Sequence, residues 1–216
     1  MSFELCNISM KFGSIRVLNE LNLTLNKGDR VGLTGKNGSG KSTVVNVATG
    51  FMVPHAGSIH LDDKPVNGKS PWAFARAGIA RTFQRPRVLK SCTLGKQLGQ
   101  HQATIERARD ILSSIDTAPS LNAFADEVPL SSLRQFEVTR ALALQPRILF
   151  LDEPSAGLSE TEISDLIKLV SDNLDPACIL VVVEHRKDFI SKVTDRVLSV
   201  VDGVAEKLDL REFAHA

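Results

Sequence analysis

The chain has 216 residues, of which 43% are hydrophobic, so it is long enough to bury a substantial core. Its 26 basic residues nearly balance its 25 acidic residues, and no long block of one charge occurs. This balance argues against nucleic acid as the main ligand, because nucleic-acid-binding surfaces are usually strongly basic. We therefore expect one domain with an inserted lobe, whose binding function resides in a local site.

The cysteines and the apolar runs argue against a metal–cysteine protein and against a membrane-spanning protein. Cys6, Cys92 and Cys178 lack the spacing of zinc ligands or of a CxxC motif, which favours reduced thiols in a cytosolic protein over a metal–cysteine site. The longest apolar run, Cys178–Val183, is far shorter than the roughly 18 residues of a membrane span. The first residues also lack the pattern of a signal peptide. We expect a chain that neither crosses nor enters a membrane by itself.

The first 30 residues predict an antiparallel pair of strands. Phe3–Phe12 and Val17–Leu25 are the two strands, and Asn26-Lys27-Gly28-Asp29 follows them as a turn. This turn also spells NKxD, which resembles the guanine-reading motif of GTPases. In GTPases that motif follows the phosphate-binding loop, whereas here it precedes such a loop, so we interpret it as a turn only.

A strand-like segment, Arg30–Thr34, leads into a glycine-rich loop and then a helical segment, 42–48. The loop matches the phosphate-binding pattern GxxxxGK[ST]. Its small residues let backbone N–H groups approach phosphate oxygens, its lysine reaches the β- and γ-phosphates, and its serine hydroxyl is a ligand for Mg²⁺. The expected nucleotide-binding residues are Gly35, Asn37, Gly38, Ser39, Gly40, Lys41, Ser42 and Thr43, with Ser42 also holding Mg²⁺.

Short apolar runs rich in β-branched residues predict buried strands, because continuous apolarity suits a sheet covered on both faces. They lie at Arg30–Leu33, Ile79–Phe83, Arg147–Leu151, Cys178–Val183 and Arg196–Val201. A capping box at Ser159–Glu162 opens a helix that places Ile163, Leu166, Ile167 and Val170 on one face. Strands that alternate with helices predict an α/β fold with a largely parallel sheet.

Residues 85–144 contain no convincing strand, and Ala103–Ile115 carries apolar residues on one helical face. We interpret 85–144 as an inserted α-helical subdomain. The remaining residues, 1–84 and 145–216, are expected to form the core with its antiparallel β subdomain.

Two acids, Asp152 and Glu153, end the apolar strand that begins at Arg147. The carboxyl edge of a parallel sheet is where α/β proteins bind ligands, so these acids are expected beside the phosphate-binding loop. Asp152 would hold Mg²⁺ through water. Glu153 would accept a proton from the attacking water, as a general base does.

Taken together, the motifs closely resemble an ABC-type ATPase over nearly the whole chain. Within that superfamily they resemble the ATP-binding subunits of branched-chain amino acid importers. The resemblance rests on Lys11-Phe12-Gly13, Thr49-Gly50-Phe51 with Pro54 and Gly57, Gly78–Gln84, Leu151–Leu158 and Val183-Glu184-His185. It implies the P-loop NTPase fold of ABC ATPases, with ATP and Mg²⁺ as cofactors.

The resemblance also implies roles for single residues. Gln84 matches the glutamine that senses the γ-phosphate and Mg²⁺ and links the helical subdomain to the membrane subunit. His185 matches the histidine that contacts the γ-phosphate and the attacking water, so the expected catalytic residues are Lys41, Gln84, Glu153 and His185. Phe12, 29 residues before Lys41, stands where the family places a ring against adenine, with a core residue at a strand end as the alternative. The remaining histidines, His55, His60, His101 and His215, are interpreted as surface residues.

One motif departs from the family. ABC ATPases pair head to tail, and a signature loop, typically LSGGQ, closes over the ATP of the opposite subunit. The nearest match is Leu130-Ser131-Ser132, which lacks both glycines. An ungapped alignment instead places Pro129 at the signature serine, so an N–H donor and a hydroxyl are lost in that version. Ser132 is also expected to cap the following helix, with Gln135 completing an S-x-x-Q box.

The function that these features indicate is that of the ATP-hydrolysing subunit of an importer for branched-chain amino acids or a related small polar solute such as urea. Its implied partners are transmembrane permease subunits, a second ATPase subunit and, indirectly, a solute-binding protein, at the cytoplasmic face of the plasma membrane. Three alternatives stay open: an export ATPase, a soluble ABC-type module that acts in DNA repair or on ribosomes, and a nucleotide-binding regulator that hardly hydrolyses ATP.

Overall fold

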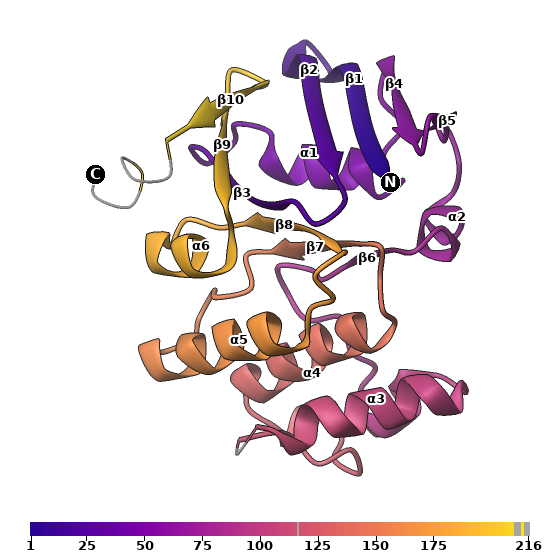
Figure 1. The fold of residues 1–216 in the computed structure, drawn as a ribbon, viewed down its shortest axis with the longest axis vertical. Coiled ribbons are helices and arrows are strands. Elements are labelled where there is room, and N and C mark those ends of the chain that lie inside the picture. Colours follow the sequence, from indigo (N-terminus) through magenta and orange to yellow (C-terminus); the bar gives the residue numbers. More distant parts are fainter. Residues whose placement is uncertain (116, 210–212, 214–216) are drawn as a thin grey trace.

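The structure, a computed structural model, describes residues 1–115, 117–209 and 213, whose strands form two sheets (Figure 1). The first sheet has the order β2-β1-β4-β5 and is antiparallel. Its strands are β1 (Ser2–Phe12), β2 (Ile15–Asn26), β4 (Ala56–Leu61) and β5 (Lys64–Pro65). The predicted N-terminal strand pair is thus confirmed, and the turn after β2 is closed by a hydrogen bond from Asp29 N to Asn26 O.

The second sheet has the order β10-β9-β3-β8-β7-β6. All its pairings are parallel except that between β9 and β10. Its strands are β3 (Arg30–Thr34), β6 (Ile79–Arg81), β7 (Ile148–Asp152), β8 (Ile179–Val183), β9 (Arg196–Val201) and β10 (Val204–Leu208). The predicted α/β fold with a largely parallel sheet is confirmed. The hairpin partner β10 and the short strands β4 and β5 were not predicted.

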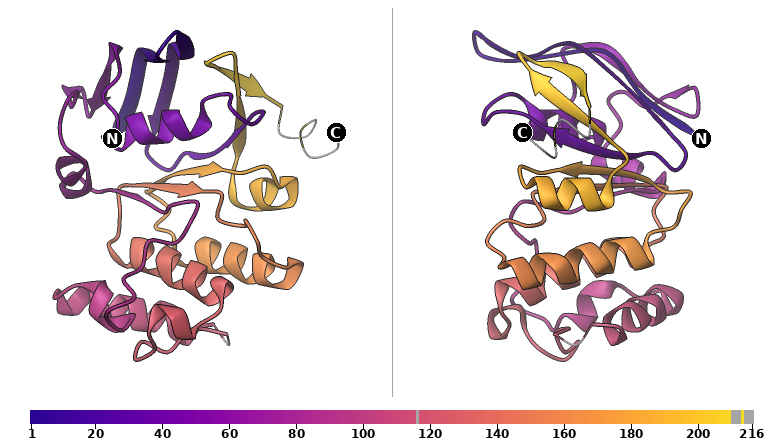
Figure 2. Two further views of the ribbon diagram at one scale, coloured as in Figure 1. Left: turned by 180° about the vertical axis from the view of Figure 1, so that it is seen from behind. Right: turned by 60° about the vertical axis from the view of Figure 1, so that its left-hand side comes forward.

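Helices cover the parallel sheet on both faces (Figure 1). They are α1 (Lys41–Ala48), α2 (Pro71–Arg76), α3 (Gln102–Ser113), α4 (Leu130–Ala143), α5 (Glu160–Asn173) and α6 (Lys187–Val193), with short 3₁₀ turns η1 (Gly95–Leu98) and η2 (Ala125–Glu127). Figure 2 shows α1 between the two sheets, α4 and α5 beneath the parallel sheet, and α3 outermost. Between the described residues 85 and 144, only one isolated bridge, Thr93 to Phe124, has strand pairing.

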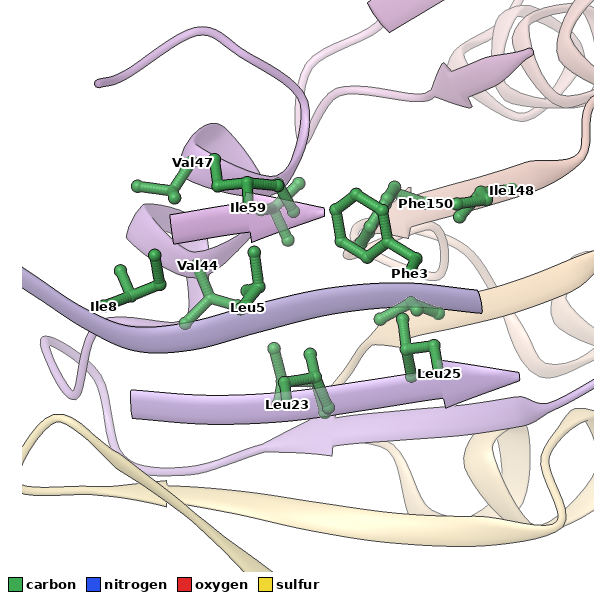
Figure 3. Close-up of a cluster of buried hydrophobic side chains, with 14 of the residues drawn as sticks. Phe3, Leu5, Ile8, Leu23, Leu25, Val44, Val47, Ile59, Ile148 and Phe150 are labelled. Atoms are coloured by element: carbon green, nitrogen blue, oxygen red, sulfur yellow. The ribbon is translucent and has the colours of Figure 1, made fainter. Parts of the chain in front are cut away.

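Two cores meet at the parallel sheet, and the central strands contribute to both. On β7, Ile148 and Phe150 belong to the core shared with α1 and the antiparallel sheet, whereas Leu149 and Leu151 belong to the core shared with α4, α5 and α6. Figure 3 shows Phe3 of β1 beside Phe150, and their rings make an edge contact with centroids 6.4 Å apart. This two-sided burial explains why the strand sequences are continuously apolar.

None of the helices in the described part of the chain is both long enough and apolar enough to span a membrane. The helix expected over Ala103–Ile115 is α3, and the strand expected over Ile79–Phe83 ends earlier, at Arg81.

The capping box at the start of α5 is confirmed and yields a stability prediction. The N–H of Glu162 donates to Ser159 Oγ at 3.4 Å, and the N–H of Ser159 donates to Glu162 Oε2 at 2.8 Å. Ser159→Ala should lower the free energy of unfolding by about 1 kcal/mol, as measured by urea denaturation, because an N–H group at the helix start loses its acceptor. The matched control is Ser171→Ala, an exposed position within the same helix, which should change stability by less than about 0.5 kcal/mol. Equal effects of the two variants would contradict the assignment.

Candidate functional site

A cleft of 580 Å³ lies at the carboxyl edge of the parallel sheet and gathers most of the predicted site residues. It is lined by Phe12, Val17, Asn37, Gly38, Gly40, Lys41, Ser42, Thr43, Gln84, Glu153 and His185. Gly35 and Ser39 line an adjoining cleft, which shares Asn37 and Gly38 with the first. Asp152 is buried, at 6% exposure, directly before Glu153. Phe12 is 46% exposed and lines the cleft, so the alternative of a core side chain is wrong.

The glycine-rich loop adopts backbone conformations that require glycine. Gly38 and Gly40 have φ of 80° and 109°. A Cβ on Gly35 would lie 2.6 Å from the carbonyl oxygen of Val200, so a larger residue would collide with β9. Helix α1 begins directly after Gly40 and has no side-chain cap. Its first N–H groups therefore remain available to an anion, and the helix dipole adds positive potential there.

Lys41 lies buried inside this loop. Its ammonium group donates to the carbonyl oxygens of Gly35 and Lys36 at 2.8 and 2.9 Å. Burial lowers the pKa of Lys41, and the nearby charges of Glu153 and Asp152 oppose that shift. The Oγ of Ser39 is enclosed and has no hydrogen-bond partner. An enclosed hydroxyl and a run of free N–H groups fit the phosphate chain of a nucleotide.

Two predicted site residues, Gln84 and His185, converge on the carboxylate of a third, Glu153. Gln84 Nε2 donates to Glu153 Oε2 at 2.7 Å, and His185 Nε2 lies 3.9 Å from Glu153 Oε1. Glu153 has a left-handed backbone with φ of 46°, which is rare for a residue with a Cβ and costs about 1–3 kcal/mol. Its N–H donates to Val183 O at 2.9 Å, and this bond holds the strained residue against the end of β8.

Asp152 is held by a buried arginine that the sequence did not single out. Arg81 Nη2 donates to Asp152 Oδ2 at 3.1 Å, and both side chains are only 8% exposed. The Arg81 guanidinium also lies 5.1 and 4.4 Å from the ring centroids of Phe51 and Phe83. Burial raises the pKa of Asp152, and Arg81 opposes that shift. Asp152 directly precedes Glu153, which lines the same cleft as Ser42 and Gln84, and these oxygen-bearing side chains fit a site for a hard cation such as Mg²⁺.

Glu184 is another residue whose role the sequence did not show. Its carboxylate is 3% exposed and accepts the N–H groups of Ser155 at 2.8 Å, His185 at 2.8 Å and Arg186 at 3.3 Å. It therefore connects the loop after β7 with the loop after β8. The sequence does contain one indication of this role: Glu184 directly follows an apolar strand, and a charged residue that is buried at such a position needs hydrogen-bond partners.

Two side chains of α4 hold the backbone around Gln84 by hydrogen bonds. Arg134 donates to Phe83 O at 2.7 Å and to Gln84 O at 2.6 Å. Its neighbour on the helix, Glu137, accepts the N–H groups of Phe83 and Arg87, both at 3.3 Å. Arg134 and Glu137 pair with each other at 3.2 Å and are 1% and 2% exposed.

The start of α4 corrects the prediction for Ser132. The helix begins at Leu130 with the extended Pro129 as its N-cap and no side-chain cap. Ser132 lies inside the first turn, buried, with its Oγ 3.5 Å from Thr117 O, so neither the cap nor the S-x-x-Q box exists. The physical reason is that Pro129 already sets the boundary, because its fixed φ suits a residue that enters a helix. Gln135 donates to Thr117 Oγ1 at 3.0 Å instead.

Three of the other histidines, His55, His60 and His101, do not line the cleft. His55 and His101 are exposed as expected, His215 lies outside the described residues, and His60 is half-buried, which corrects the prediction of a surface residue.

A parallel sheet with a strand, glycine-rich loop and helix at its carboxyl edge, and an acidic pair facing the loop lysine, defines a P-loop nucleoside triphosphatase. Comparison with known proteins narrows this class. The family model described as "ABC transporter" matches residues 18–156, and the chain belongs to this family of ATP-hydrolysing transporter cassettes.

Named relatives agree with this assignment. The chain is 32% identical to the high-affinity branched-chain amino acid transport ATP-binding protein LivG of Escherichia coli K12, over 91% of this chain and 86% of that protein. It is 29% identical to the corresponding protein BraF of Pseudomonas aeruginosa, over 93% and 88%. Among solved structures, a nucleotide-free ATP-binding cassette from an ABC transporter has a TM-score of 0.87 at 26% identity, covering 100% of this chain and 94% of that one.

The buried pair of Arg134 and Glu137, which holds the backbone around Gln84, leads to the second prediction. Arg134→Met should destabilise the protein by about 3–5 kcal/mol in chemical denaturation, because Glu137 stays buried without its cation. Arg134→Met combined with Glu137→Leu should cost less than the single Arg134→Met change, since no unpaired charge remains. Glu137→Leu alone is measured as well. A stability loss in the double variant that equals the sum of the losses of the two single variants would contradict a coupled pair.

Proposed function

We propose that the chain binds and hydrolyses ATP as a subunit of an importer for branched-chain amino acids or a related small polar solute. The observation that carries the catalytic part is the convergence of Gln84 and His185 on the strained Glu153, in the cleft that contains Lys41. The transported solute is proposed from the relatives alone, since LivG and BraF are branched-chain amino acid transport ATP-binding proteins.

The role proposed for each residue follows from its position in the cleft. The N–H groups at the start of α1 and the Lys41 ammonium bind the phosphates, and the ring of Phe12 lies against adenine. Glu153 accepts the proton of the attacking water, and His185 orients that water and the γ-phosphate. Gln84, hydrogen-bonded to Glu153, reports whether the γ-phosphate is present. Mg²⁺, held by Ser42, Asp152 and Gln84, would neutralise phosphate charge.

The signature segment supports a pair of unlike ATPase subunits. Pro129 has no N–H to offer to a phosphate, and the bulky Leu130 side chain is 46% exposed at the helix start. The Ser159 N–H and, after it, the Ser131 hydroxyl lower the pKa of Glu162. We propose that this chain's ATP is hydrolysed against an intact signature of its partner, while ATP facing residues 129–132 turns over slowly.

The assembly proposed here adds transmembrane permease subunits and an external solute-binding protein, with this chain at the cytoplasmic face. A regulator that binds ATP without hydrolysing it is the second candidate, and the altered signature favours it. The retention of both Glu153 and His185 in contact favours the hydrolytic subunit.

The third prediction tests whether Glu153 is the general base. In the assembled transporter, Glu153→Gln should lower ATP hydrolysis at least about 100-fold, because the general base is lost. The affinity for ATP with Mg²⁺, measured by calorimetry, should stay within a few-fold. Lys41→Ala serves as the comparison variant that loses binding as well. Unchanged hydrolysis by Glu153→Gln would show that another residue accepts the proton.

The fourth prediction tests the signature. A variant that carries Pro129→Ser, Leu130→Gly, Ser131→Gly and Ser132→Gln should raise turnover at the second site of a reconstituted transporter by about tenfold or more. Each restored hydrogen bond to a charged phosphate contributes roughly 1.5–3 kcal/mol, which corresponds to a tenfold or larger effect if it acts in the transition state. The same variant combined with Glu153→Gln is the control for background hydrolysis. No change in turnover would refute the proposal of unlike sites.

A further inference from the structure

A second group of ligand-type side chains lies on the antiparallel sheet, away from the nucleotide cleft. Glu4 and Cys6 are two residues apart on β1, so they point to the face opposite the core residues Phe3 and Leu5. Strand β4 pairs with β1 so that His60 lies opposite Glu4. This pairing places a carboxylate, a thiol and an imidazole together on one face.

The three groups are close enough to share one ion. A carboxylate oxygen of Glu4, the Sγ of Cys6 and a ring nitrogen of His60 all lie within 4.8 Å of one another, and Cys6 Sγ is 4.0 Å from Glu4 Oε2. In the part of the chain that the structure describes, no other three histidine, cysteine or acidic side chains meet in this way.

The half-buried imidazole supplies an independent observation. Nδ1 of His60 is enclosed and has no hydrogen-bond partner. An enclosed ring nitrogen without a partner is costly, and native structures rarely keep one unless another group or an ion satisfies the histidine. Glu4 and Cys6 are also half-buried, so the site is partly shielded from water while remaining open to an ion.

We propose that Glu4, Cys6 and His60 bind one divalent ion of the zinc class, with water as the fourth ligand. One thiolate, one imidazole and one carboxylate form a set that Zn²⁺ accepts, whereas Mg²⁺ and Ca²⁺ prefer oxygen ligands alone. Bond lengths of about 2.0–2.3 Å place the ligand atoms of a tetrahedral zinc site roughly 3.3–3.8 Å apart. Small side-chain rotations therefore close the observed arrangement around an ion.

Binding involves no redox step. The Cys6 thiol loses its proton to solvent as the sulfur–metal bond forms, and His60 binds as the neutral imidazole. The ion joins β1 to β4 across the sheet, roughly 25 Å along β1 from Phe12 by the rise of a strand. It is therefore distinct from the Mg²⁺ expected beside ATP. Cys178 is unsuited to such a role, because burial raises the pKa of its thiol to about 12.

The test is a Co²⁺ titration of the reduced full-length chain without nucleotide, followed by displacement with Zn²⁺. We expect one equivalent to bind, with d–d absorption of tetrahedral Co²⁺ and a thiolate charge-transfer band. Cys6→Ser and His60→Ala should each weaken binding at least about tenfold, and Cys6→Ser should abolish the charge-transfer band. The matched controls, Cys92→Ser and His55→Ala, should leave the titration unchanged. Binding without a thiolate band, or binding that Asp152→Asn removes, would overturn the proposal.

A second measurement needs no variant and so does not depend on folding. Alkylation of Cys6 by iodoacetamide, followed by mass spectrometry, should slow at least about tenfold when Zn²⁺ is added. Alkylation of Cys92 in the same sample should not change. Equal rates at Cys6 with and without Zn²⁺, or equal slowing at both cysteines, would overturn the proposal.

Discussion

The buried ion pair between Arg134 and Glu137 is the constraint on which the geometry of the cleft depends. Four hydrogen bonds run from these two side chains to the backbone of residues 83–87. They connect α4, which begins at Leu130 in the segment proposed to match the signature, to the segment that presents Gln84 to Glu153. A shift of α4 would therefore move the Gln84 carbonyl directly. Under the proposed pairing, a partner contact at the start of α4 would be transmitted to Gln84 through these hydrogen bonds.

A second set of contacts fixes the acids themselves. Arg81 holds Asp152, while Glu184 ties the loop after β7 to the N–H of His185. The left-handed backbone of Glu153 is maintained between these two anchors. The strained backbone of Glu153 persists because the buried network around it determines its position, and strained residues of this kind are common at functional sites.

The sequence predicted the parts of this fold that depend on local pattern. The glycine loop, the capping box of Ser159 and the continuously apolar strands are all encoded by neighbouring residues. The roles of Arg81 and Arg134 could not be predicted from local pattern, because their partners Asp152 and Gln84 lie 71 and 50 residues away in the sequence. The cluster around Cys6 could not be predicted for the same reason, since only the pairing of β1 with β4 brings His60 to it. The cap at Ser132 was predicted wrongly because the local S-x-x-Q pattern competed with Pro129, which sets the helix start.

We propose that this chain is asymmetric: it hydrolyses its own ATP but completes the site of a partner poorly, because residues 129–132 lack the glycines of the signature. The most direct test is ATP hydrolysis per molecule of the isolated chain over a wide range of protein concentration, with ATP binding measured alongside. We expect ATP to bind while turnover stays low and does not rise with concentration. Activity per molecule that climbs with concentration would mean that two copies complete each other's sites, and it would contradict the account.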